Sequence, residues 1–185
     1  TGYLLGSLPT AYVAGRRHGM DVRAIGNGVA GASNVFRHVS KRAGIIVGAI
    51  DVAKGAVPVV LARVVDIGPW LLFGAGAAAL IGHWWPVFNG FHGGMGAAAG
   101  IGAVGAVLPV PSLIGAPFAL IALLWARKPS PAVGTLMGVA VVAAVLLHTP
   151  LWEVAVAAGL SVMVLVRTLT WRTPHQPAPD SKGTS

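Results

Sequence analysis

The fold of this chain is decided by residues 44–65, which read GIIVGAIDVAKGAVPVVLARVV. Only Asp51, Lys54 and Arg63 interrupt this apolar run with charge. An α-helix needs roughly 20 mostly apolar residues to cross the hydrocarbon layer of a bilayer. Residues 44–65 therefore predict a transmembrane helix that carries an aspartate and a lysine within the membrane.

Similar apolar runs occupy most of the remaining sequence. Hydrophobic residues make up 55% of the 185 residues and charged residues only 10%, which is too apolar for a soluble domain of this length. We expect about seven transmembrane helices, over residues 1–15, 44–65, 69–88, 95–109, 113–126, 132–148 and 151–166. The predicted fold is an all-α, polytopic membrane helix bundle.

The domain organisation follows from the same runs. We expect one transmembrane domain over residues 1–172 and a disordered cytoplasmic tail over 173–185, which is rich in Pro, Ser and Gly. The chain opens directly in apolar sequence, so we expect it to begin inside its first helix. The fourth and fifth runs, joined by residues 109–112, form either two spans or one re-entrant pair.

The basic residues are sorted by the gaps between these runs. Every lysine and arginine except Lys54 and Arg63 follows the first, fifth or seventh run. These gaps face the same side of a membrane if seven helices cross it. Because basic loops remain in the cytoplasm, we expect the N-terminus outside and the basic loops in the cytoplasm of a bacterium, with the chain in its inner membrane. The net charge of +8 favours binding to anionic lipid head groups. The sequence contains no polar basic domain that could bind nucleic acid.

The first of two glycine-rich segments, DVRAIGNGVAGASNVFR at 21–37, lies in the longest basic gap. Its glycines let backbone N–H groups converge on an anion, and its arginines add positive charge. We therefore expect phosphate binding by this segment, whose candidate residues are Arg23, Gly26, Asn27, Gly28, Gly31, Ser33, Asn34 and Arg37. The alternative is a flexible interfacial loop whose arginines only set the topology.

The second segment, GHWWPVFNGFHGGMG at 82–96, ends one predicted helix with aromatic residues and opens the next with a glycine turn. A helix N-terminus with small residues and free N–H groups binds anions. The candidate phosphate-binding residues are His83, Gly93, Gly94 and Gly96. An aromatic belt before a tight turn explains the tryptophans, but it does not explain three glycines in four positions.

Asp51 and Lys54 lie one helical turn apart inside the second apolar run. Charges within a membrane are costly and usually pair inside the helix bundle. This pair is a candidate functional site. A salt bridge that only stabilises helix packing is an equal alternative.

Metal and thiol chemistry find no support in the sequence. Cysteine is absent, which excludes disulfides and thiolate nucleophiles, and no two of the six histidines have helical ligand spacing with a carboxylate. We expect no metal site.

Four motifs in order resemble those of the acyl-phosphate:glycerol-3-phosphate acyltransferases, the PlsY family. They are Gly6-Ser7-Leu8-Pro9, the segment at 21–37, Asp51-Val52-Ala53-Lys54-Gly55 and the segment at 82–96. The resemblance implies a seven-helix membrane enzyme of phospholipid biosynthesis that works without metal or coenzyme. Such an enzyme transfers a fatty acyl group from acyl-phosphate to the sn-1 hydroxyl of glycerol 3-phosphate and yields lysophosphatidic acid. It further implies Arg37 and Asn27 as catalytic residues, and we expect a monomer, because one bundle can enclose its own site.

The sequence departs from the family pattern at several polar positions. Asn27 and Val29 replace a serine and an asparagine, and Met95 replaces a lysine. Val166 and Leu169 replace the histidine and asparagine of the closing motif. Each lost charge-assisted hydrogen bond is worth about 1.5 to 3 kcal/mol.

These departures keep two alternatives open beside a working acyltransferase. One is a catalytically impaired paralogue that binds lipid or phosphate. The other is a small multi-pass transporter, suggested by Asp51 and Lys54 within a span and by glycine-broken helices.

Overall fold

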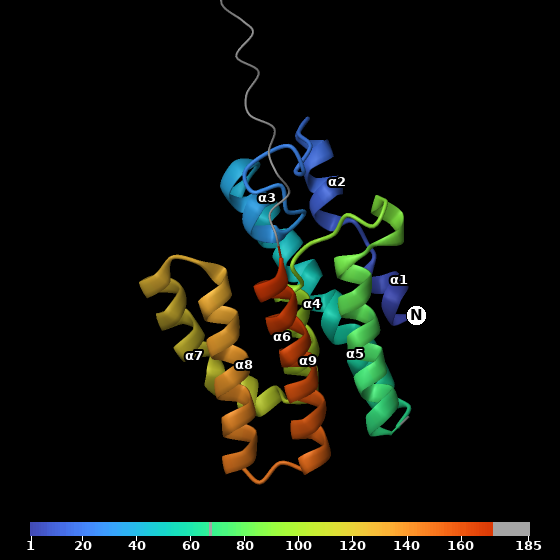
Figure 1. The fold of residues 1–185 in the computed structure, drawn as a ribbon, viewed down its shortest axis with the longest axis vertical. Coiled ribbons are helices and arrows are strands. Elements are labelled where there is room, and N and C mark those ends of the chain that lie inside the picture. The colour runs from blue at the N-terminus through green and yellow to red at the C-terminus, as the bar shows by residue number, and fades with distance from the viewer. Residues whose placement is uncertain (67, 172–185) are drawn as a thin grey trace, which may run out of the picture.

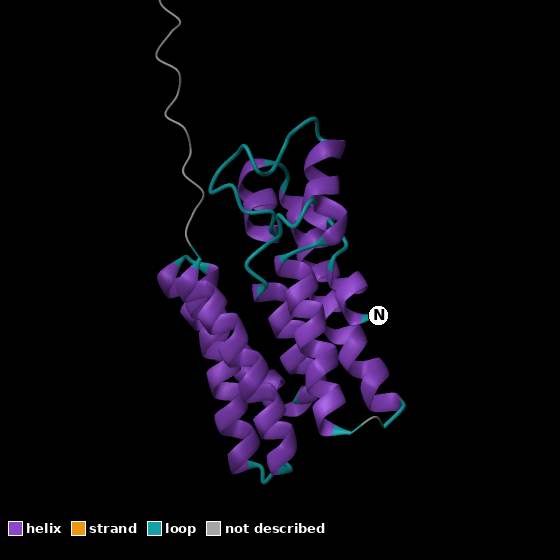
Figure 2. Cartoon of the chain, turned by 45° about the vertical axis from the view of Figure 1, so that its right-hand side comes forward, coloured by secondary structure: helices purple, strands orange, loops and turns teal. Residues whose placement is uncertain are grey.

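The computed structural model describes residues 1–66 and 68–171, and the predicted tail at 173–185 lies outside them. Figure 1 and Figure 2 show helices packed side by side with loops gathered at one end of the bundle. The helices are α1 (Gly2–Gly6), α2 (Thr10–Arg17), α3 (Ala32–His38), α4 (Lys41–Val64), α5 (Pro69–Trp84), the 3₁₀ helix η1 (Val87–Asn89), α6 (Ala97–Val107), α7 (Pro109–Ala126), α8 (Pro129–Leu146) and α9 (Leu151–Thr170).

The long helices have the dimensions of membrane spans. Within the described residues, α4, α5 extended by η1, α7, α8 and α9 are long and apolar enough to cross a membrane. Helix α6 has 11 residues and rises about 16 Å, roughly half the hydrocarbon thickness. The predicted all-α helix bundle is confirmed. The number of crossings and the side of the N-terminus stay predictions.

The N-terminal run is not the single helix that its apolar composition predicts. It forms α1 and α2, separated by Ser7, Leu8 and Pro9. Pro9 has no N–H to donate and disfavours helical backbone at Leu8, so the helix stops there. The freed carbonyl of Leu8 accepts hydrogen bonds from the Thr10 N–H at 2.9 Å and from Lys54 Nζ at 2.8 Å.

Residues 109–112 do not form the connector expected from their two prolines. Helix α7 begins at Pro109, and only Leu108 separates it from α6. Proline is well tolerated at the first helical position, where its missing N–H would have no intrahelical partner.

Glycines bring the backbones of neighbouring helices together. Gly55 of α4 lies against the carbonyl of Ala99 in α6, and Gly102 of α6 lies against the carbonyl of Val52 in α4. A Cβ at either glycine would overlap backbone atoms, so only glycine permits this spacing. Small residues at helix contacts are typical of membrane bundles, where van der Waals packing replaces the hydrophobic effect.

The end of the bundle that holds α2, α3 and the turn between α7 and α8 is called the loop end (Figure 1). The glycine-rich segments at 21–37 and 82–96 both lie there, together with the basic residues that surround α2 and α3. At the opposite end, Arg63 pairs with Glu153 at 2.9 Å. The charges are therefore sorted along the bundle as the sequence predicts.

Candidate functional site

A cavity of about 640 Å³, called the large cavity, lies between α6, α8 and α9 beneath the first glycine-rich segment. Its volume is within the usual range for a small-molecule site. The apolar part of its lining is formed by Ala97, Ala98, Ile101, Val133, Met137, Val162, Val164 and Leu165. This part of the cavity suits a hydrocarbon chain.

The mouth of the large cavity, at the loop end, is polar and cationic. It is lined by Asn27, Ser33, Arg37, Lys128 and Ser130. Arg37 Nη2 donates to the carbonyl of Arg127 at 3.4 Å, which places α3 beside the turn that precedes α8. Neither Arg37 nor Lys128 forms an ion pair within the described part of the chain. The cavity therefore combines a positively charged entrance with an apolar interior.

The first glycine-rich segment is shaped by Asn34. This side chain is 2% exposed, and its Nδ2 lies 2.9 to 3.1 Å from the carbonyls of Val22, Ile25 and Val29. Gly26 and Gly28 adopt left-handed φ values of 58° and 69°, which glycine accepts without strain. Asn34, Gly26 and Gly28 thus hold the loop in shape and do not line the large cavity, whereas Gly31 and Ser33 do.

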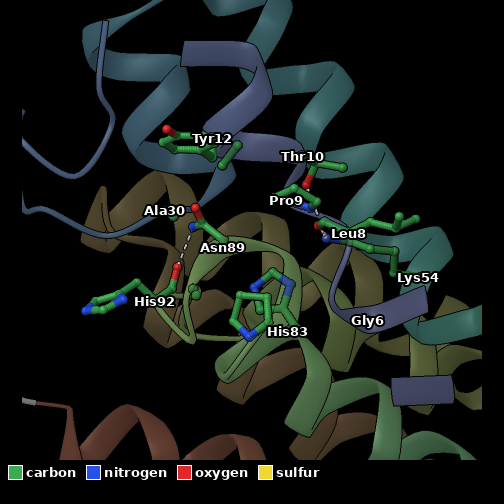
Figure 3. A pocket seen from close by; sticks show the side chains of 14 residues that line it. Gly6, Leu8, Pro9, Thr10, Tyr12, Ala30, Lys54, His83, Asn89 and His92 are labelled. Atoms are coloured by element: carbon green, nitrogen blue, oxygen red, sulfur yellow. Dashed lines mark hydrogen bonds between the residues drawn. The ribbon is translucent and has the colours of Figure 1, made fainter. Parts of the chain in front are cut away.

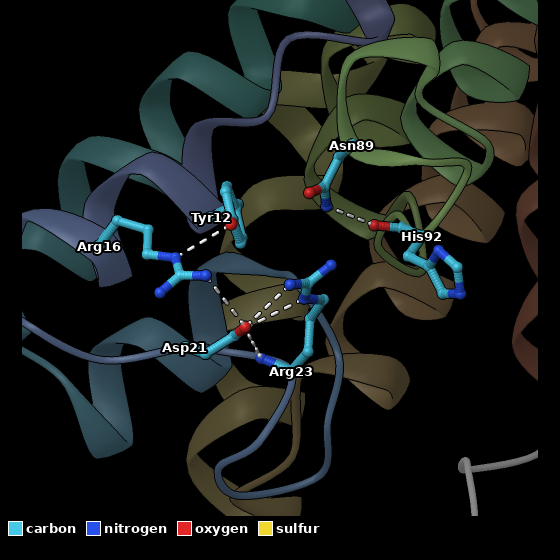
Figure 4. A network of polar contacts seen from close by, with 6 residues as sticks. All are labelled: Tyr12, Arg16, Asp21, Arg23, Asn89 and His92. Carbon is cyan, nitrogen blue, oxygen red and sulfur yellow. Dashed lines mark hydrogen bonds and ion pairs between the residues drawn. The ribbon is translucent and has the colours of Figure 1, made fainter.

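Arg23 lies outside both of the cavities described here. Its Nη2 pairs with Asp21 Oδ2 at 2.8 Å, and its guanidinium lies 4.7 Å from the ring centre of Tyr12 (Figure 4). Hydrogen bonds from the Arg23 side chain and then from its backbone N–H lower the pKa of Asp21 to about 2, and the same pairing raises the pKa of Arg23. The charge of Arg23 is therefore neutralised locally, and its contacts fasten the segment to α2.

The second glycine-rich segment folds back over the end of α5. The Gly94 N–H donates to the carbonyl of His83 at 3.1 Å, and Trp84 Nε1 donates to the carbonyl of Met95 at 3.0 Å. Gly96 has a φ of 83° and lies against the Trp84 indole, so a side chain there would be both strained and blocked. Met95 and Gly96 line the large cavity at the first turn of α6.

A second cavity, called the small cavity, has room for about one water molecule, at about 20 Å³ (Figure 3). Its polar lining includes Thr10, Lys54, His83 and Asn89, and Gly93 and Gly94 close one side. Asn89 Nδ2 donates to the carbonyl of His92 at 2.7 Å.

The predicted ion pair between Asp51 and Lys54 is present and buried. Lys54 Nζ lies 2.8 Å from Asp51 Oδ1, with the side chains 4% and 1% exposed. Thr10 Oγ1 donates to Asp51 Oδ1 at 2.7 Å. Asp51 lines the large cavity, Lys54 lines the small cavity and His83 lines both. The pair therefore lies in the wall between the two cavities.

Sequence reasoning missed the contribution of the turn between α7 and α8. The sequence pattern identifies Lys128 only as a topological charge, yet it lines the large cavity with Pro129 and Ser130. One signal in the sequence could have indicated this role. Lys128 stands directly before Pro-Ser-Pro, a sequence typical of a helix start, and its gap is predicted to lie on the same side of the membrane as Arg37. Ser161 and Thr168 of α9 were also missed, because their spacing resembles ordinary lipid-facing sequence.

The two positions of the closing motif that depart from the family pattern do not line the large cavity, although Thr168 between them does. Val166 and Leu169 are 50% and 75% exposed and line neither cavity. Arg167 stacks over Trp85 at 4.9 Å and Trp171 at 4.3 Å. Arg172, the last residue of this motif, lies outside the described residues.

Comparisons with known proteins agree with this architecture. Residues 1–173 match the family model described as glycerol-3-phosphate acyltransferase. A glycerol-3-phosphate acyltransferase of Rubrobacter xylanophilus is 46% identical over 108 residues, which cover 58% of this chain and 54% of the relative. One of Parasynechococcus marenigrum is 50% identical over 102 residues, which cover 55% of this chain and 48% of the relative. The chain thus spans about half the length of the curated relatives it matches.

Two solved structures share the fold over most of both chains. The crystal structure of PlsY (YgiH), an integral membrane glycerol 3-phosphate acyltransferase, in its glycerol 3-phosphate form has a TM-score of 0.81 at 34% identity, covering 91% of this chain and 84% of that one. The lysophosphatidic acid form has a TM-score of 0.79 at 34% identity, covering 90% and 83%.

Proposed function

Because the chain belongs to the glycerol-3-phosphate acyltransferase family, we propose that it transfers a fatty acyl group from acyl-phosphate to the sn-1 hydroxyl of glycerol 3-phosphate. The products are lysophosphatidic acid and inorganic phosphate. The structural relatives, crystallised in glycerol 3-phosphate and lysophosphatidic acid forms, support this choice of substrate and product.

The large cavity is the observation that carries the proposal. An acyl-phosphate has an anionic head and a long apolar tail, and the cavity offers cations at its mouth and an apolar interior. A soluble metabolite alone would not bury apolar surface against the lining between α6, α8 and α9. An apolar lipid alone would carry no anionic group to bind Arg37 and Lys128.

The residues at the mouth have distinct roles in this proposal. Arg37 donates charge-assisted hydrogen bonds to phosphate oxygen, which are stronger than neutral ones. The Asn27 side chain accepts from the Val29 N–H at 3.2 Å through Oδ1, which leaves its NH₂ group to donate to the developing oxyanion. Gly31, Ser33 and Gly96 bring backbone close to the substrate, while Gly26, Gly28 and Asn34 hold the loop that positions them.

The remaining candidates lie away from the mouth of the large cavity. Gly93 and Gly94 set the turn that aims the N-terminus of α6, whose first N–H groups have no intrahelical partner. His83 occupies the wall shared with the small cavity. Arg23 stabilises the first segment through Asp21 and does not contact substrate.

The chemistry requires little beyond alignment and charge stabilisation. The hydroxyl oxygen of glycerol 3-phosphate attacks the acyl carbon, the bond from that carbon to the phosphate oxygen breaks, and the leaving phosphate takes the hydroxyl proton. An acyl-phosphate is already activated, so no cofactor or metal enters these steps. Holding the reactants in line accounts for a large part of such rate enhancements.

A non-catalytic lipid or phosphate binder is the second candidate function. It is favoured by Val29 and Met95, which line the large cavity with apolar side chains at positions where the family pattern has polar ones. Such a protein would keep the cavity and lose turnover.

The proposed setting is the inner membrane of a bacterium, with the loop end in the cytoplasm. Glycerol 3-phosphate then enters from the cytoplasm and acyl-phosphate from the lipid. We propose that one copy of the chain suffices, because the described residues of a single bundle supply both the cationic mouth and the apolar lining of the large cavity.

The test is acyl transfer by the full chain in detergent, with acyl-phosphate and labelled glycerol 3-phosphate. We expect labelled lysophosphatidic acid and stoichiometric phosphate from the wild type, and a loss of about tenfold to a hundredfold in kcat/KM for Arg37→Ala. Arg17→Ala, an exposed residue on α2 that lines neither cavity, is the matched control. Absence of product with retained binding of glycerol 3-phosphate would refute the enzyme and favour the binder.

A further inference from the structure

Lys128 occupies a defined place at the mouth of the large cavity. It is the residue before Pro129, the first residue of α8, and it lines the cavity together with Pro129 and Ser130. Arg37 reaches the same mouth from α3, and its Nη2 bonds the carbonyl of Arg127, the neighbour of Lys128 and 90 residues away in sequence. Two cations that are far apart in the sequence thus line one cavity.

Among residues 1–66 and 68–171, no carboxylate pairs with either of these two cations. Asp51 is the one acidic residue in this part of the chain that lines the large cavity, and it is bound to Lys54 at 2.8 Å. Asp21, at the same end of the bundle, is bound by Arg23. Within the described residues, Arg37 and Lys128 have no ion-pair partner. The mouth therefore carries two units of positive charge that are free to bind an anion.

The second glycine-rich segment adds no charge to this mouth. In this segment, the uncharged side chain of Met95 lines the large cavity, and His83 is buried in the wall between the two cavities. A divalent phosphate that entered the cavity would therefore meet Arg37 on one side and, on the α8 side, Lys128 as the one cation among the described lining residues.

We propose that Lys128 is a substrate-binding residue that, with Arg37, forms a two-sided cationic clamp on the phosphate of the acyl donor. This proposal rests on the proposed function, since it names a ligand of the same site. Lys128 holds the phosphate at the start of α8 while the acyl chain lies along the apolar lining below. Because Met95 faces the same cavity, a positive charge placed at residue 95 should replace that of Lys128.

The experiment measures binding of dodecyl phosphate and acyl-transfer kinetics for the full chain in an uncharged detergent. We expect Lys128→Ala to weaken dodecyl phosphate binding and to raise KM for acyl-phosphate by about tenfold to a hundredfold. Lys128→Arg should keep most of the affinity. Adding Met95→Lys to Lys128→Ala should restore affinity, a result that a merely structural role would not produce.

The matched control is Lys41→Ala, an exposed lysine at the same end of the bundle that lines neither cavity. Normal turnover with unchanged dodecyl phosphate binding in Lys128→Ala would overturn the clamp and leave the proposed function intact. If the wild type shows no turnover but its dodecyl phosphate binding depends on Lys128, the phosphate site is upheld and the proposed enzymatic function is refuted.

Discussion

Single residues determine how charge is tolerated inside this bundle. Asp51 and Lys54 are both buried, and each has further hydrogen bonds, from Thr10 to the carboxylate and from Lys54 to the carbonyl of Leu8. A buried charge is stable only when it is paired and hydrogen-bonded. The pair therefore also stabilises the break between α1 and α2, where Leu8 has lost its helical partner.

Removing one member of this pair should cost more than removing both. Asp51→Leu or Lys54→Met leaves an uncompensated buried charge, which typically destabilises a protein by about 3–5 kcal/mol. The double variant removes both charges and should be closer to the wild type than either single variant. Thermal unfolding of the four proteins in detergent measures this coupling. Additive losses would show that the two charges do not act as a pair.

Asp21 should make stability depend on pH in the acidic range. Its pKa in the folded protein is about 2, below the usual value of 3.8, because Arg23 donates hydrogen bonds to the carboxylate. The stabilisation is therefore complete above about pH 4, falls between 3.8 and 2, and is lost below 2. The difference in unfolding temperature between wild type and Asp21→Asn should shrink across this window. A constant difference from pH 6 to pH 2 would contradict the role of this pair.

At the scale of elements, α8 contributes an unusually smooth wall to the large cavity. Gly134 and Gly138 both line it, one helical turn apart, and a Cβ built at either residue meets no atom within 4 Å. Both glycines are exposed, as are Val162 and Leu165 on α9, so the cavity is open along this side. An acyl chain has free space along α8 because these residues lack side chains.

Filling this space should shorten the preferred acyl chain. Gly138→Leu adds a side chain at a position where a Cβ meets no atom within 4 Å. If it displaces about three methylene groups at about 0.8 kcal/mol each, the loss corresponds to roughly fiftyfold in kcat/KM. Long-chain acyl-phosphates should lose this factor and short ones should not. Gly105→Leu is the control, since Gly105 also has open space but does not line the cavity. An equal loss for all chain lengths would exclude α8 as the wall beside the acyl chain.

The elements differ in how well the sequence predicts them. The helix over residues 44–65 appears as α4, because a long apolar run must satisfy its own backbone hydrogen bonds in lipid. The run at 1–15 divides at Pro9, although it contains no charged residue, because proline interrupts the helical backbone there. Pro109, expected in a connector, begins α7 because the first position of a helix suits proline.

At the scale of the whole molecule, both glycine-rich segments meet at the loop end. Gly94 lies against the carbonyl of Ala30, so the two segments are in direct contact. The proposed reaction requires this arrangement, because a phosphorylated, water-soluble acceptor must reach the mouth from the cytoplasm.

Labelling of introduced cysteines tests this placement, and the absence of native cysteine makes each label unambiguous. Ser33→Cys and His92→Cys, both exposed at the loop end, should react with an impermeant reagent only from the cytoplasmic side. Pro150→Cys, in the turn between α8 and α9, should react only from the other side. Reaction of Ser33→Cys and His92→Cys from opposite sides would contradict both the shared mouth and the proposed function.

The sequence by itself determined that the chain is a helix bundle for a membrane, that most of its basic residues lie at one end, and that two glycine-rich segments accompany them. These properties depend on the length and composition of local runs. Tertiary structure alone decided that Lys128 and Arg37 lie at the same mouth, that Arg23 forms an ion pair with Asp21, and that the Asn34 side chain holds a loop in shape. The reason is physical: which side chains share a cavity depends on how distant helices pack and on the hydrogen bonds that orient each loop, and neither is encoded in local periodicity.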